Sequence, residues 1–187
     1  MYRGELVYLS PTEPADIVDN GHWINDPEIG HNLGTKYPTS RDASERFAKE
    51  MLAGAGKTIY PFNIHRLSDG HRIGGIVLRD VDRENGGAEL AIFVGERSEL
   101  GRGYGTDALR CIEDFGFGEL RLHRIELAVF DYNVRAIRAY EKAGFRTEVV
   151  LRRARFHRGV HHDVLIMAIL FEEWLAQDRP RAWEDRD

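Results

Sequence analysis

The sequence of 187 residues has a single cysteine, Cys111. One cysteine excludes an intrachain disulfide, so a disulfide-stapled secreted scaffold is not expected. No apolar run approaches the roughly 20 residues of a membrane-spanning helix, and the first residues lack a signal-peptide apolar stretch. We therefore expect a cytoplasmic protein without a membrane partner. Because Cys111 falls within a helical pattern, a buried structural thiol is favoured over a nucleophile.

A large excess of charge of one sign is also lacking. The formal net charge is −5, with 42% hydrophobic and 30% charged residues, which are ordinary values for a globular protein. This balance gives no reason to expect direct nucleic-acid binding. The chain shows no repeat, low-complexity segment or interdomain linker. We expect one domain over residues 1–175, followed by a charged tail over residues 176–187.

The hydrophobic pattern predicts an α/β (α+β) fold in which a mixed, mainly antiparallel, twisted sheet of about six to seven strands carries helices on both faces. Residues 28–38, which lack periodicity, are expected to be a loop or short helical pieces that wall a substrate pocket. The expected strands are 5–9, 59–67, 72–78, 88–94, 123–130, 145–155 and 163–170, and the expected helices begin near residues 16, 39, 106 and 133.

A glycine-rich turn at residues 100–106 joins an apolar strand to a helix. Three glycines allow the backbone to approach a ligand closely, and the free N–H groups of a helix N-terminus attract anions. By itself this pattern fits a phosphate cradle and a plain tight turn equally well. A dinucleotide fingerprint is excluded, because it needs a further glycine where Thr106 stands.

Three stretches in order give the sequence a family resemblance. Residues 88–94 and 100–109 resemble the coenzyme A strand and pyrophosphate turn, Q/R-x-x-G-x-G/A, of the GNAT superfamily of N-acetyltransferases. Residues 133–145, NVRAIRAYEKAGF, match N-x-x-A/S-x-x-x-Y-E-K-x-G-F, and residues 163–168 resemble the closing strand. The turn variant is similar to the branch that includes ribosomal-protein N-terminal, spermidine and some antibiotic acetyltransferases.

The resemblance implies that acetyl-CoA is the co-substrate and that no metal is needed. The turn would bind the diphosphate, and the strand edge at 90–94 would hold the pantetheine arm. Leu100 departs from the preferred Gln or Arg, a charge that Arg102 can supply. Arg97 and Arg135 are weighed as ribose-phosphate contacts against ordinary solvated arginines. The predicted coenzyme-binding residues are Ile92, Phe93, Val94, Leu100, Gly101, Arg102, Gly103, Tyr104, Gly105, Thr106, Asn133, Arg135 and Tyr140.

The catalytic residues implied are Tyr140 and Glu89. Tyr140 matches the tyrosine that protonates the leaving thiolate in the family, against the alternative of a plain core aromatic. Glu89 is the candidate base, acting directly or through water, against the alternative of an outward-pointing glutamate. The N–H of Phe93 or Val94 is the candidate oxyanion donor. Asn133 is expected both to cap its helix and to contact the pantetheine arm.

The acceptor is expected to be a primary amine, either a protein N-terminus or a small amine, that attacks the thioester directly. Asp26 and Glu28 are reserve contacts for its ammonium group. A basic stretch at the final hairpin has a solvated strand face as its default interpretation, and it also motivates the hypothesis of an acidic acceptor such as a protein or an RNA-associated peptide. Its residues are Arg152, Arg153, Arg155, His157 and Arg158. The cluster of His157, His161 and His162 is not expected to hold a metal. The alternatives left open are a coenzyme A-binding module without turnover, and a homodimer through an exposed strand edge.

Overall fold

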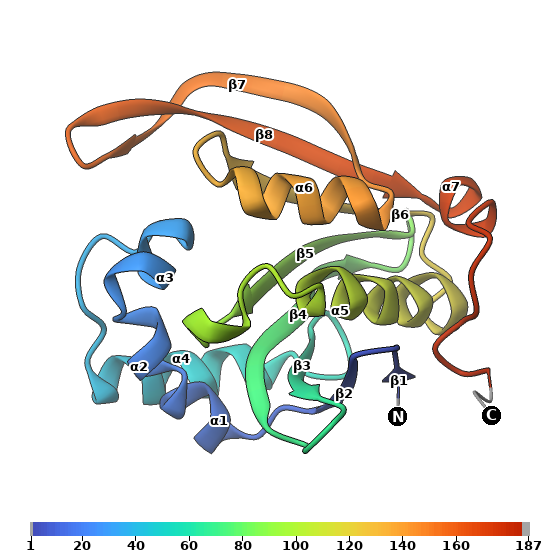
Figure 1. The fold of residues 1–187 in the computed structure, drawn as a ribbon, viewed down its shortest axis with the longest axis horizontal. Helices are drawn as coiled ribbons and strands as arrows, with labels where there is room; N and C mark the ends of the chain where they lie inside the picture. Colours follow the sequence, from blue (N-terminus) through green and yellow to red (C-terminus); the bar gives the residue numbers. More distant parts are fainter. Residues whose placement is uncertain (1, 185–187) are drawn as a thin grey trace.

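The computed structural model describes residues 2–184, which form one eight-stranded sheet with the order β1-β2-β3-β4-β5-β6-β8-β7 (Figure 1). The strands are β1 Tyr2–Arg3, β2 Val7–Pro11, β3 Tyr60–Arg66, β4 Arg72–Asp82, β5 Gly87–Val94, β6 Arg124–Phe130, β7 Arg146–His157 and β8 Val160–Leu170. The helices are α1 Pro14–Asp19, α2 Gly21–Ile24, α3 Pro27–Asn32, α4 Arg41–Ala53, η1 Arg97–Glu99, α5 Tyr104–Glu113, η2 Asp114–Glu119, α6 Val134–Ala143 and α7 Phe171–Leu175.

The predicted fold class is confirmed, and the strand count needs correction. Every neighbouring pair is antiparallel except β5 with β6. Four consecutive residues of β4, 73–76, are buried, which shows that both faces of the sheet are covered there. The strand that was not predicted is β1, which has only two residues. A pair of residues is too short to show the alternation from which a strand is predicted.

Helix α5 follows the glycine turn, as predicted, but it begins before the expected residue 106. It begins at Tyr104 because Gly103, with a left-handed φ of 91°, breaks the chain direction just before it. Its buried face includes Ala108, Cys111 and Ile112, so the thiol is a core group. After Glu113 the chain continues as a π-helix, η2, and that wider winding is not visible in the hydrophobic period.

Residues after α7 pack back against η2. The carboxylate of Asp114, itself fully buried, accepts hydrogen bonds from Trp174 Nε1 (2.8 Å), Arg179 Nη1 (2.9 Å) and the N–H of Ala182 (2.7 Å). Beside it, burial raises the pKa of Glu113 to about 8 although Arg179 lies 3.3 Å away. The division into a domain over residues 1–175 and a tail over residues 176–187 stays a prediction. Residue 1 of the domain and residues 185–187 of the tail lie outside the described residues. In residues 2–184 no helix is long and apolar enough to cross a membrane.

Candidate active site

Strands β5 and β6 pair over three residues and then part. Gly87, Ala88 and Glu89 pair with residues 124–126 in parallel register, and no pair follows along residues 90–94 of β5 within the described chain. On its other side β5 stays paired with β4 as far as Val94. The sheet therefore has an internal open edge along the C-terminal half of β5, next to the glycine turn.

The direction of the backbone groups along β5 follows from two hydrogen bonds at its ends. The carbonyl of Gly86 accepts from His123 N (2.7 Å) on the β6 side, whereas the N–H of Gly95 donates to Ile73 O (2.8 Å) on the β4 side. Because these directions alternate along an antiparallel-paired strand, even-numbered residues direct their N–H and C=O groups toward the gap. Those residues are Leu90, Ile92 and Val94, and the N–H of Phe93 is directed toward β4.

The glycine turn presents an uncapped helix N-terminus. Gly101 and Gly103 have φ of 78° and 91°, a region that side-chain-bearing residues rarely adopt. No side chain caps α5, so the first-turn N–H groups of this helix are available to an anion. Arg102 is exposed at the turn, with Nη1 3.7 Å from the buried carboxylate of Glu99. The geometry fits a diphosphate group.

A carboxylate that the sequence analysis missed fastens this helix to the sheet. Asp107 is buried and accepts hydrogen bonds from the N–H groups of Glu5 (3.1 Å), Leu6 (2.8 Å) and Val7 (3.0 Å). It also touches the position of Gly4, where a Cβ would lie 2.1 Å from its Oδ2. An acidic residue in the first turn of a helix was visible in the sequence, but its partners, about 100 positions away, were not.

Asn133 and Tyr140 belong to the N-cap and the last turns of α6, the helix that follows β6. Asn133 is the N-cap residue of α6, and its Oδ1 accepts from Ala136 N (3.3 Å), which confirms the capping half of its prediction. Tyr140 is only 8% exposed and its ring meets Phe145 edge-on at 6.0 Å. Burial raises the pKa of Tyr140 to about 12, so the phenol is neutral at any physiological pH.

Glu89 lies at the closed end of the gap. It stands opposite Glu126 in the last paired position of β5 and β6, and its carboxylate is 2.5 Å from Arg79. At about 3.3 Å per residue, five residues place it roughly 16 Å along the strand from Val94. Its role as base stays a prediction, and a direct role would require the carboxylate to leave Arg79 and act far from the open end.

The reserve residues at α3 are engaged with the two arginines that were weighed as phosphate contacts. Asp26 caps α3 and is 2.6 Å from Arg97, whose guanidinium lowers the pKa of this carboxyl. Glu28 lies 3.4 Å from Arg97 and 3.6 Å from Arg135. These ion pairs connect α3 to η1 and to the start of α6, so both carboxylates already have a cationic neighbour.

Helix α3 also contacts the tip of the β7–β8 hairpin, which lies above it in Figure 1. His31 Nδ1 is 2.8 Å from His157 Nε2, and the ring of His31 stacks on Tyr132 at 4.4 Å. Tyr132 in turn donates to the carbonyl of His31 (3.1 Å). Neither His31 nor Tyr132 was singled out in the sequence, because an isolated histidine and tyrosine carry no pattern.

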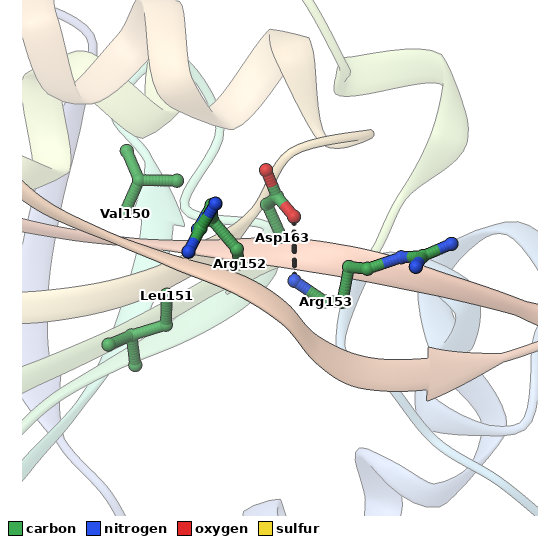
Figure 2. Close-up of a pocket in the computed structure, with 5 residues that line it drawn as sticks. All are labelled: Val150, Leu151, Arg152, Arg153 and Asp163. Carbon is green, nitrogen blue, oxygen red and sulfur yellow. Dashed lines mark hydrogen bonds between the residues drawn. The ribbon is translucent and has the colours of Figure 1, made fainter.

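A bulge lies in β7, before the hairpin tip that contacts α3. Between the paired residues Leu151 and Arg155, the strand has more residues than its partner β8, and Arg153 takes a left-handed φ of 52°. Figure 2 shows the surface hollow at this bulge, where Arg153 N donates to Asp163 Oδ1 (2.7 Å) and the guanidinium groups of Arg152 and Arg153 point away from each other.

The sequence is similar to those of known proteins. Residues 7–146 match the family described as "Acetyltransferase (GNAT) domain". The Bacillus subtilis protein "Probable N-acetyltransferase YjcK" is 31% identical over 178 residues, which cover 91% of this chain and 97% of that protein. The spermidine N(1)-acetyltransferase of Escherichia coli is 30% identical over 111 residues, 59% of each chain.

The fold is also similar to solved structures. A spermidine N-acetyltransferase from Vibrio cholerae, solved in complex with CoA and spermine, superposes with a TM-score of 0.81. The match covers 91% of this chain and 98% of that one at 24% sequence identity, a level at which the likeness concerns the fold alone.

Proposed function

The chain belongs to the GNAT acetyltransferase family and is an acetyl-CoA-dependent N-acetyltransferase, and from this premise we propose how it works. The acetyl group of acetyl-CoA is moved to a primary amine by direct attack while both substrates are bound. The observation that carries this proposal is the open inner edge of β5 beside the uncapped N-terminus of α5. The unpaired backbone N–H and C=O groups of β5 suit the pantetheine amides, and the free N–H groups at the start of α5 suit the diphosphate.

The glycine turn and the open edge of β5 bind different parts of acetyl-CoA. The N–H groups of residues 101–106 hold the diphosphate, with Arg102 adding charge that Leu100 lacks. Ile92 and Val94 offer backbone groups to the pantetheine arm, because their N–H and C=O groups are directed into the gap. Asn133 and Arg135 lie at the start of α6, the helix that follows the C-terminal end of β6, and they are the predicted contacts of acetyl-CoA on that side.

The reaction itself uses few side chains. The amine nitrogen attacks the thioester carbon, the C–S bond breaks, and the thiolate takes a proton from the Tyr140 hydroxyl. The N–H of Val94 is the oxyanion donor, since that of Phe93 is directed toward β4. The amine must be neutral to attack, and Glu89 remains the predicted acceptor of its proton, reached through water because the carboxylate lies at the closed end of the gap.

Release of free thiol from acetyl-CoA tests the proposal. The acceptors are a polyamine, an aminoglycoside, an amino acid and an N-terminal peptide, with calorimetry run in parallel to measure acetyl-CoA binding. We expect thiol release, dependent on amine, with at least one class. Binding of acetyl-CoA without thiol release on any amine would instead favour the alternative, a coenzyme A-binding sensor or partner module.

We further propose that two copies of the chain associate through β7. This strand is at the edge of the sheet and pairs only with β8 among the described strands. Its residues Val149, Val150 and Leu151 are 47%, 49% and 44% exposed, an apolar run on an unprotected edge. Two such edges are self-complementary about a two-fold axis, so a second copy is the partner that fits.

A further inference from the structure

Three cationic side chains surround His157, where the hairpin tip meets α3, and one of them lies over Phe130 at the C-terminal end of β6. Arg155 donates to the carbonyl of Gly34, and its guanidinium lies over the ring of Phe130 at 5.2 Å. Arg158 donates to Pro27 O (3.2 Å), and Lys36 lies on the segment after α3. We call Lys36, Arg155 and Arg158 the basic mouth.

No carboxylate forms an ion pair with the cations of the basic mouth in the part of the chain that the structure describes, although Asp131 lies in the same region and acts on Tyr132 together with Arg155 and Arg158. The groups that its arginines bond are neutral backbone carbonyls. Asp131 is 3.2 Å from His162, and the acidic residues of α3, Asp26 and Glu28, lie beside Arg97 and Arg135.

Two further observations point to a site for an anion. The Nε–H of Arg155 is buried beside Phe130 and has no hydrogen-bond partner, so this guanidinium keeps one unsatisfied charged donor. The pKa values of His31 and His157 are lowered, first by burial and then by the Arg158 cation, which is what a local positive potential does to a histidine. The whole chain is acidic, so this potential is local.

We propose that the acceptor carries an anionic group beside its amine, a carboxylate or a phosphate, and that the basic mouth binds this group. The inference rests on the proposed transferase function and specifies its substrate class. A polyamine, which is cationic along its length, would be repelled by the same three side chains. The acceptor is therefore of a different charge class from the spermidine named for the Escherichia coli relative.

The test compares acceptors that differ only in charge. Three peptides with identical N-terminal residues carry Asp, Asn or Lys at the second position, and glutamate, glutamine and spermidine are assayed beside them by thiol release. We expect kcat/KM to fall in the order Asp, Asn, Lys, with about a tenfold span between Asp and Lys. The span should shrink in high salt, because exposed charges are screened. A larger value for glutamate than for the Asp peptide identifies a free amino acid, and the reverse identifies a chain terminus.

Variants connect the preference to the basic mouth. Lys36→Gln combined with Arg158→Gln should remove most of the Asp-over-Lys preference while leaving acetyl-CoA binding intact. Arg46→Gln, on the exposed face of α4, removes a cation elsewhere and should leave the preference unchanged. Thiol release that favours spermidine or the Lys peptide, or a preference that survives the double variant, overturns this inference and leaves the transferase function standing. Absence of thiol release with every amine removes both.

Discussion

Tyr140 combines two properties at the scale of a single residue. It is buried at 8% exposure on the face of α6 that is turned toward the sheet, yet it carries a hydroxyl. A purely structural aromatic at this position would be served equally well by phenylalanine. The pKa of about 12 keeps the proton on the oxygen, which is the state that an acid needs.

Replacement of that hydroxyl separates the two roles. Tyr140→Phe should lower kcat by on the order of a hundredfold, because the leaving thiolate loses its proton donor, with little change in the dissociation constant of acetyl-CoA. Steady-state kinetics and calorimetry measure the two quantities. An unchanged kcat would leave Tyr140 as a core residue only.

At the scale of an element, the turn before α5 can be tested by comparing one of its glycines with a glycine of similar conformation elsewhere. Gly101 has φ of 78° and open space around its Cβ position, and so does Gly56, with φ of 76°, in the loop after α4. The two glycines are therefore a matched pair for backbone strain, but only Gly101 belongs to the predicted diphosphate site.

Alanine at each position tests this element. Gly101→Ala and Gly56→Ala should each lower the free energy of unfolding by about 1 kcal/mol, because both force an L-residue into the left-handed region. Only Gly101→Ala should weaken acetyl-CoA binding, by about tenfold, when measured by calorimetry. Equal effects of the two variants on binding would remove the turn from the site.

The contact between α3 and the hairpin should depend on pH. The pKa values of His31 and His157 are lowered in the folded protein, so this contact is favoured while both rings are neutral and weakens as pH falls below about 6.5 through the lowered values. Protonated rings would face Arg155, Arg158, Lys36 and His162. Amide exchange of the hairpin tip, corrected for intrinsic rates, should accelerate between pH 7 and pH 5. Constant protection over that range would contradict the proposed dependence.

Elements with a strong local pattern could be predicted from the sequence, whereas contacts between distant elements could not. Alternation of apolar and polar residues predicts strands β3 to β5, helical periodicity predicts α6, and glycine spacing predicts the turn at residues 100–106. The three N–H groups held by Asp107, the ion pairs of Asp26 and Glu28, and the stacking of His31 on Tyr132 depend on how the sheet brings remote segments together. Glu89 illustrates the same limit, because only the pairing of β5 with β6 places it at the closed end of the gap.

At the scale of the whole molecule, the proposed dimer depends on one exposed edge. Val150→Asp places a charge in the middle of the apolar run of β7 without touching the gap between β5 and β6. Sedimentation should show a two-copy species for the unsubstituted protein and a single chain for the variant, since like charges meet across the two-fold axis. A protein that sediments as a single chain before substitution would contradict the proposal.

The central claim is that the open edge of β5 and the turn before α5 together hold acetyl-CoA. Amide hydrogen exchange, measured with and without acetyl-CoA, tests this placement residue by residue. The account predicts new protection at residues 90–94 and 100–106, while strands β3 and β7 exchange as before. Acetyl-CoA binding that protects other segments and leaves residues 90–106 unchanged would contradict it.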